Sequence, residues 1–115
     1  MQFQNLDIWK RSRQLSIEVY RYSRCIKDYG FKDQITRCTL SVPSNIAEGI
    51  EKDYQKEKSR YLAISKGSLG EFYTQVDIGI EVGFIEKELG MKWMCEAKEL
   101  SKMIAGLIKR LKSSN

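Results

Sequence analysis

Apolar residues recur every three or four positions along most of the chain, and no stretch alternates as a β-strand would. This spacing is typical of amphipathic helices. We predict helices over residues 6–28, 32–50, 54–84 and 87–112, joined by short connections. Short connections make consecutive helices antiparallel neighbours. The predicted fold is therefore an all-α, up-down-up-down four-helix bundle, with residues 1–115 forming one domain.

Each predicted helix carries a stripe of apolar residues for the core. In the first helix the stripe is Ile8, Leu15, Val19, Tyr22 and Ile26. In the second it is Ile35, Thr39, Val42 and Ile46. In the third it is Leu62, Leu69, Phe72, Val76 and Ile80, joined by Tyr61, Tyr73 and Gly83. In the fourth it is Trp93, Ala97, Leu100, Ile104, Leu107 and Leu111.

A second stripe in the second helix has the same period but is mostly polar, and it runs past a mid-helix proline, Pro43. Its members are Gln34, Cys38, Ser41, Asn45 and Glu48. Buried polar groups must form hydrogen bonds or cost about 1–3 kcal/mol each. Three interpretations stay open: a solvent-facing stripe, a hydrogen-bonded buried network, or a ligand site.

The third helix contains Gly67, Ser68 and Gly70, which leave its backbone bare at a cost of about 1 kcal/mol per glycine. We expect close approach of another helix there, namely the second. Together the two helices would form a structural polar seam whose members are Gln34, Ser41, Asn45, Glu48, Ser68 and Glu71. Within it, Asn45 and Glu48 are predicted to hydrogen-bond to neighbouring helices or to water.

Two helices carry apolar residues outside their core stripes. Ile64, Ile78 and Val82 form a second apolar line on the third helix, and Glu71 lies on that line. On the first helix the extra residues are Trp9, Ile17 and Tyr20. A helix that is apolar on more than one side has more than one surface to bury. We predict that Trp9, Ile17 and Tyr20 contact another subunit.

The net charge of +5 is unevenly distributed. Residues 1–29 carry net +3 and residues 87–115 net +4, whereas residues 30–86 carry net −2. On the first helix, helical spacing gathers Lys10, Arg13, Arg21 and Arg24 on the side opposite the core stripe. On the last helix, Lys98, Lys102 and Lys109 share a face. Such surfaces are either simply solvated or bind nucleic acid, an acidic protein or a membrane surface.

The sequence excludes several kinds of chemistry. The absence of histidine rules out Ser-His and Cys-His nucleophiles. Cys25, Cys38 and Cys95 lack CxxC spacing, which argues against zinc and disulfide frameworks, so we expect buried reduced thiols and no metal or other cofactor. No apolar run approaches the ~20 residues of a membrane span. Residues 1–13 are polar and charged, without the continuous apolar region expected of a signal peptide. We therefore expect a cytoplasmic protein without membrane contact.

Four segments carry a resemblance to a known family: FQNLDIW at residues 3–9, QITR at 34–37, SVPSNIAEG at 41–49 and GSLGE at 67–71. They resemble the bacterial four-helix-bundle proteins encoded by intervening sequences of 23S ribosomal RNA genes. The match covers almost the whole chain, and the Ser-x-Pro-x-Asn-Ile-Ala-Glu-Gly block is its specific part. The chain departs from the pattern at Cys38, Thr39 and Gly70.

The resemblance implies a ring-shaped homo-oligomer, a pentamer. It also implies similarity to the accessory proteins of diversity-generating retroelements, which are basic bundles that bind nucleic acid and a reverse transcriptase. It implies no catalytic activity. The family positions that match Asn45, Glu48, Ser68 and Glu71 carry no established role.

Three functional hypotheses follow. The leading one is a non-enzymatic, oligomeric nucleic-acid-associated protein that contacts phosphates through the basic faces of its first and last helices. The alternative is a scaffold that binds an acidic protein partner and has no nucleic-acid role. The third is an enzyme that holds a hard metal ion with Glu48, Glu71 and Asn45. The absence of histidine weighs against the third, because ferritin-type bundle sites use Glu-x-x-His motifs.

Overall fold

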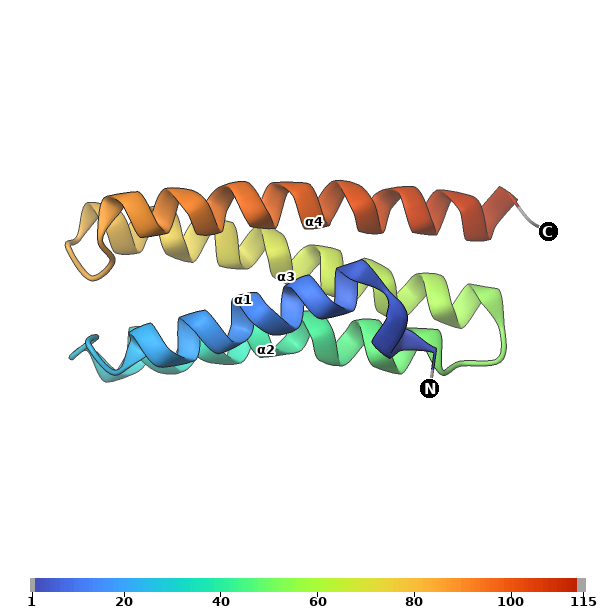
Figure 1. The fold of residues 1–115 in the computed structure, drawn as a ribbon, viewed down its shortest axis with the longest axis horizontal. Coiled ribbons are helices and arrows are strands. Elements are labelled where there is room, and N and C mark those ends of the chain that lie inside the picture. Colours follow the sequence, from blue (N-terminus) through green and yellow to red (C-terminus); the bar gives the residue numbers. More distant parts are fainter. Residues whose placement is uncertain (1, 114–115) are drawn as a thin grey trace.

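The computed structural model describes residues 2–113. They form a short 3-10 helix, η1 (Phe3–Asn5), followed by the α-helices α1 (Asp7–Ser23), α2 (Tyr29–Ile50), α3 (Gln55–Glu81) and α4 (Lys87–Ser113). The α-helices lie side by side in alternating directions, so that α1 begins and α4 ends at the same end of the bundle (Figure 1). The predicted all-α antiparallel bundle is confirmed.

The helices follow one another around the bundle axis. α2 packs against both α1 and α3, and α3 packs against α4. The contact between α4 and α1, which closes the circle, is the least extensive of the four. The bundle measures 47 × 21 × 21 Å, so it is equally wide in its two short directions.

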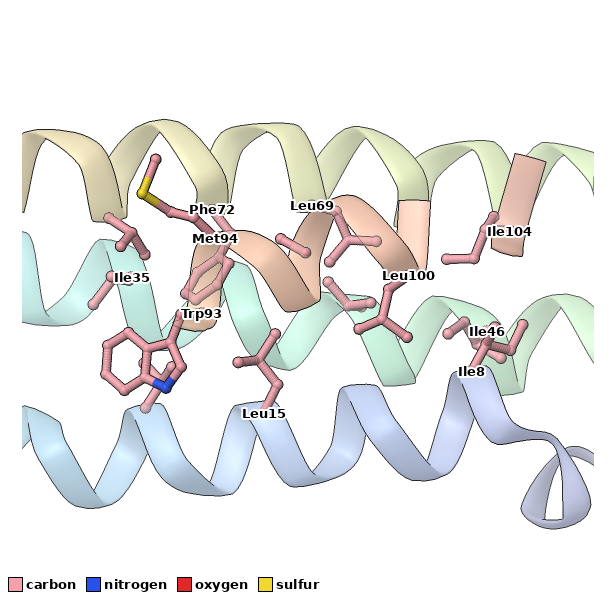
Figure 2. Packing of buried hydrophobic residues seen from close by; sticks show 14 of the residues in the cluster. Ile8, Leu15, Ile35, Ile46, Leu69, Phe72, Trp93, Met94, Leu100 and Ile104 are labelled. Carbon is pink, nitrogen blue, oxygen red and sulfur yellow. The ribbon is translucent and has the colours of Figure 1, made fainter. Parts of the chain in front are cut away.

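The predicted stripes meet along the axis and form the core (Figure 2). Trp93 of α4 is buried in it, with its ring edge-on to Tyr22 of α1 at 5.5 Å and tilted against Phe72 of α3 at 6.2 Å between centroids. Its indole N–H donates to the Glu18 carboxylate of α1 over 3.3 Å. The fully buried side chains include Ile35, Ile46, Leu62, Leu69, Phe72, Leu100 and Ile104.

The connection between α1 and α2 lies earlier than predicted. α1 ends at Ser23, and α2 begins at Tyr29 because the Asp28 carboxylate accepts a hydrogen bond from the Phe31 backbone N–H at 2.9 Å. This side-chain cap satisfies a backbone donor that the helix leaves unpaired. Ile26 is buried as expected, but from the connection rather than from α1.

The end of α3 also differs from the prediction. The helix stops at Glu81, and Gly83 adopts φ +80°, which L side chains rarely adopt. Gly83 is therefore an exposed turn residue and not part of the core stripe.

The glycines that allow close packing are not the ones expected. A Cβ added at Gly67 or Gly70 would meet nothing within 4 Å. By contrast, a Cβ at Gly49 would lie 2.9 Å from Tyr61 Cβ, and one at Gly79 would lie 2.6 Å from Ile85 Cδ1. The expected approach of α2 to this stretch occurs at Ser68, whose Oγ lies 2.7 Å from Ser41 Oγ, and the two glycines beside it face open space.

The thiols also differ from expectation. Cys25 and Cys95 are exposed, and only Cys38 is partly buried. Cys25 lies in the connection after α1, and Cys95 lies between core positions of α4 on the outward side. Separately, none of the helices within residues 2–113 combines the length and apolar character needed to cross a membrane.

Candidate nucleic-acid interface

The outward side of α1 carries the predicted basic face. Lys10, Arg13 and Arg21 of this helix and Arg24, the C-cap residue that follows it, are all exposed. Among the residues that the structure describes, none of these four cations takes part in an ion pair. Their positive charge is therefore not neutralised by a carboxylate of the same chain.

Arg11 shows the opposite arrangement on the same helix. Its guanidinium faces α4, where Nη2 lies 2.6 Å from Glu96 Oε1 and 2.8 Å from Glu99 Oε1, and Nε donates to Glu96 Oε2 over 3.0 Å. These hydrogen bonds to the two carboxylates raise the pKa of Arg11. The carboxylates of Glu96 and Glu99 thus form ion pairs between α1 and α4, away from the basic face of α1.

The α4 lysines form a separate surface. Lys98, Lys102 and Lys109 are exposed. Lys98 Nζ lies 5.6 Å from the centroid of the Tyr73 ring on α3, whereas Glu96, two residues earlier, turns toward α1. The predicted cations therefore form two surfaces, one on α1 and one on α4. The shallow hollow of about 270 Å³ beside Lys98, lined by Tyr73, Gly70 and Ser101, was not found from the sequence.

A groove lies between α1 and α2, beside the basic face. It encloses about 370 Å³ and is lined by Arg13, Ser16, Ile17, Tyr20, Arg21, Leu40 and Pro43. Tyr20 and Leu40 are 44% and 48% exposed. The groove therefore has an apolar floor with an arginine at each end of its α1 side. We call it the α1–α2 groove.

The structure brings together two of the three predicted subunit-contact residues. Ile17 and Tyr20 both line the α1–α2 groove. Trp9 does not line it. Its ring meets the Phe3 ring of η1 edge-on, with 5.3 Å between the ring centroids, and packs against the core. Leu40 was missed from the sequence, although its place outside the core stripe of α2 was a usable signal.

The polar seam between α2 and α3 is short. Ser41 Oγ lies 2.7 Å from Ser68 Oγ and 2.7 Å from the carbonyl oxygen of Cys38. Asn45 donates from Nδ2 to the Ser41 carbonyl at 2.8 Å, within its own helix. Ser65, which the prediction left out, donates to the Val42 carbonyl at 2.7 Å. Side-chain donors thus satisfy the carbonyls of Cys38, Ser41 and Val42, which all precede Pro43 in α2.

The other predicted members of the seam lie at the surface of the single chain. Gln34, Glu48 and Glu71 are exposed, and Glu48 lies 3.6 Å from Lys52 Nζ, four residues along α2. The solvent-facing interpretation fits these three residues, whereas the hydrogen-bonded interpretation fits Ser41, Asn45 and Ser68.

Cys38 lies at the edge of the seam, where its Sγ donates to the Ser68 carbonyl over 3.2 Å. Burial, followed by the nearby negative charge of Glu71, raises the pKa of the Cys38 thiol to about 11. The thiol is therefore a protonated donor at neutral pH. Within residues 2–113 there is no group of three or more acidic, cysteine or histidine side chains that could hold a metal ion.

Comparisons with known proteins agree with this fold. Residues 4–106 match the family model described as 23S rRNA-intervening sequence protein. Among solved structures, the chain is similar to a protein of unknown function from the S23 ribosomal protein family of Bacteroides thetaiotaomicron, with a TM-score of 0.85 at 18% identity over 89% of this chain and 98% of that one. No curated protein matches the chain.

Neither description indicates an enzymatic family. At this identity, the structural likeness shows a shared fold. The match over residues 4–106 covers most of the chain, which therefore belongs to the 23S rRNA-intervening sequence protein family.

Proposed function

We propose that this protein is a non-enzymatic, oligomeric nucleic-acid-associated protein that binds phosphates through its basic helical faces. The observation that carries the proposal is the set of exposed, unpaired cations on the outward side of α1: Lys10, Arg13, Arg21 and Arg24. Phosphate contacts position a protein on nucleic acid without specifying a base sequence. Sequence preference should therefore be weak.

The α4 lysines provide a second phosphate-binding surface in this proposal. Lys98 lies beside the Tyr73 ring, and an aromatic ring next to a cation is a combination that single-stranded nucleic acid uses for base stacking and phosphate contact. Family membership supports an association with ribosomal RNA genes. Neither basic surface indicates a catalysed reaction.

Self-association belongs to the same proposal. The family resemblance implies a ring homo-oligomer, a pentamer, and exposed apolar residues such as Tyr20 supply surface for it. A ring would repeat each basic face and so raise the number of phosphates bound at once. A reverse transcriptase or another protein is a further expected partner, and the expected compartment is the cytoplasm.

The test compares charge-neutralising variants that leave the α1–α2 groove intact. One variant carries Lys10→Gln and Arg24→Gln, and a second carries Lys98→Gln, Lys102→Gln and Lys109→Gln. A matched control carries Lys56→Gln and Lys87→Gln, which removes two exposed lysines from elsewhere. Affinity for a fluorescent RNA and for its DNA equivalent is measured at ~50 mM salt, where phosphate contacts are strong.

The expected result is a loss of roughly tenfold or more in affinity for the α1 variant, with a much smaller loss for the control. Equal losses of affinity in the α1 variant and in the control would mean that net charge, and not the α1 face, drives binding. No affinity in the wild type would overturn the proposal. In that case a partner protein that stays bound after nuclease treatment would favour the alternative, a scaffold for an acidic protein.

A further inference from the structure

An unpartnered apolar line runs along the outer side of α3 and ends at Val82, the C-cap residue of that helix. Ile64, Ile78 and Val82 are 42%, 50% and 56% exposed, and Glu71 lies between the two isoleucines. The bare backbone at Gly67 adjoins the same line. Each member follows the previous one by four or seven residues, which places them along one side of the helix. We call Ile64, Glu71, Ile78 and Val82 the α3 line.

The α1–α2 groove has the complementary character. Its floor is apolar, and Arg13 and Arg21 lie at its edges without an acidic residue among the lining side chains. Glu71 is exposed and has no ion-pair partner within residues 2–113. A carboxylate between two aliphatic side chains thus faces outward on one side of the molecule. Two arginines beside an apolar floor face outward on another.

We propose that the α3 line of one copy of the chain packs into the α1–α2 groove of the next copy, with Glu71 placed between Arg13 and Arg21. This inference rests on the self-association in the proposed function and names its two surfaces. The contact joins two different surfaces, so it is heterologous. Such contacts form a closed ring if the rotation between copies closes, and an open filament if it does not.

The positions of the two surfaces along the bundle favour a closed ring. The hydrogen bond between Ser41 and Ser68 fixes which parts of α2 and α3 lie at the same height. Leu40 in the groove directly precedes Ser41, and Glu71 on the α3 line follows Ser68 by less than one helical turn. The two surfaces therefore overlap in height along the bundle. A contact between overlapping surfaces needs little shift along the axis, which favours a ring over a filament.

The relative direction of the two surfaces also favours a ring. The groove opens on the α1–α2 side of the bundle, and the α3 line lies on the neighbouring α2–α3 side and not on the opposite one. Each contact therefore turns one copy relative to the next, and repeated turns of the same sense form a closed ring when the rotation closes.

The arrangement leaves nucleic-acid surfaces exposed. α4 takes no part in the contact, so Lys98 and Lys109 stay exposed. On α1, Arg13 and Arg21 would face Glu71 of the neighbouring copy. Lys10 and Arg24, which do not line the groove, would remain available to phosphates. The separation makes assembly and nucleic-acid binding testable with different substitutions.

The test uses two variants, each of which removes one of the two surfaces. Leu40→Asp places a carboxylate in the groove, where it would repel Glu71, and Ile78→Asp places one on the α3 line. Met91→Asp, at a residue 50% exposed on the outer side of α4, is the matched control. Mass is measured by light scattering, and helix content by circular dichroism confirms that each variant is folded.

We expect the wild type and the Met91→Asp control to have several times the single-chain mass of 13.4 kDa. The Leu40→Asp and Ile78→Asp variants should each have the single-chain mass. An equimolar mixture of the two variants should give a species of twice that mass. Each partner then contributes one intact surface, whereas each variant alone cannot pair.

Two outcomes would overturn the inference while leaving self-association intact. One is an unchanged oligomer in either variant, and the other is a mixture of two monomeric variants that forms no dimer. A monomeric wild type would overturn both the inference and the self-association on which it rests. Nucleic-acid binding is decided separately, by the variants outside the groove.

Discussion

The Oγ atoms of Ser41 in α2 and Ser68 in α3 lie 2.7 Å apart, beside the proline of α2. Ser68 is 8% exposed, so this contact is largely shielded from water. The two hydroxyls join the helices within the segments that carry the family resemblance. The resembling segments thus build the bundle at this point.

Replacing either serine with alanine should lower the free energy of unfolding by about 1 kcal/mol, the usual net value of a hydrogen bond. The double variant should lose less than the sum of the two single losses, because both substitutions remove the same contact. Chemical denaturation of the single and double variants measures this coupling. Ser44→Ala, at an exposed position of α2, is the control. Strict additivity would show that the two hydroxyls do not interact.

The three thiols should react at different rates. Cys25 and Cys95 are exposed, whereas Cys38 is partly buried and burial raises its pKa to about 11. Because the thiolate is the reactive form, Cys38 should be alkylated by iodoacetamide much more slowly than the other two at pH 8. Mass spectrometry of timed samples identifies the modified residue. Equal rates at the three positions would contradict the described environment of Cys38.

The same pKa shift predicts how stability changes at high pH. The Cys38 pKa is raised in the folded protein from the ordinary value of 9.0 to about 11, so folding disfavours the thiolate. The contribution of Cys38 is fully present below pH 9.0 and is lost as pH rises toward about 11. Cys38→Ala should flatten this part of the stability profile measured by denaturation. An identical slope in the variant would refute the assignment.

Alanine at two glycines should have opposite effects on the stability of the chain. A Cβ at Gly49 would lie 3.1 Å from the Lys58 carbonyl oxygen and 2.9 Å from Tyr61 Cβ, so Gly49→Ala should destabilise by about 1–3 kcal/mol. A Cβ at Gly70 meets nothing, so Gly70→Ala should stabilise α3 by up to about 1 kcal/mol. Thermal denaturation compares them. Destabilisation by Gly70→Ala would indicate a close neighbour at that position.

Arg11 should matter more for stability than other charged residues do. It forms ion pairs with both Glu96 and Glu99 and so joins α1 to α4. These two helices make the least extensive contact of the four around the bundle. Arg11→Gln should cost about 1 kcal/mol, and the loss should shrink as salt rises. Arg37→Gln, which removes an exposed pair with Asp33, should cost less. Equal losses would show that Arg11 does not hold α1 to α4.

The bundle itself was predictable because the core stripes keep helical spacing over whole helices. The stripe of Trp93, Ala97 and Leu100 is an example, and all three residues are buried. The end of α1 was not predictable from this pattern. Ile26 continues the apolar period although it lies in the connection. The better signal was Asp28, whose short carboxylate can cap a helix.

The surfaces were only partly predictable. Periodicity places Lys10 and Arg24 on the outward side of α1, as the structure does, but it cannot show that α1 and α4 carry separate basic faces. That separation depends on which neighbouring helix each α4 residue meets: Lys98 meets α3, and Glu96 meets α1. The preference of free cysteine for the interior also misled the prediction for Cys95, because its position between core residues decides its exposure.

The central claim is that this protein binds nucleic acid by neutralising phosphates. The measurement that tests it most directly is the affinity of the wild type for a single-stranded RNA across salt concentrations from ~50 to ~200 mM. If the five cations outside the groove contact phosphates, a plot of log affinity against log salt should have a slope of about −3.5. A flat dependence, or no binding at the lowest salt, would contradict the claim.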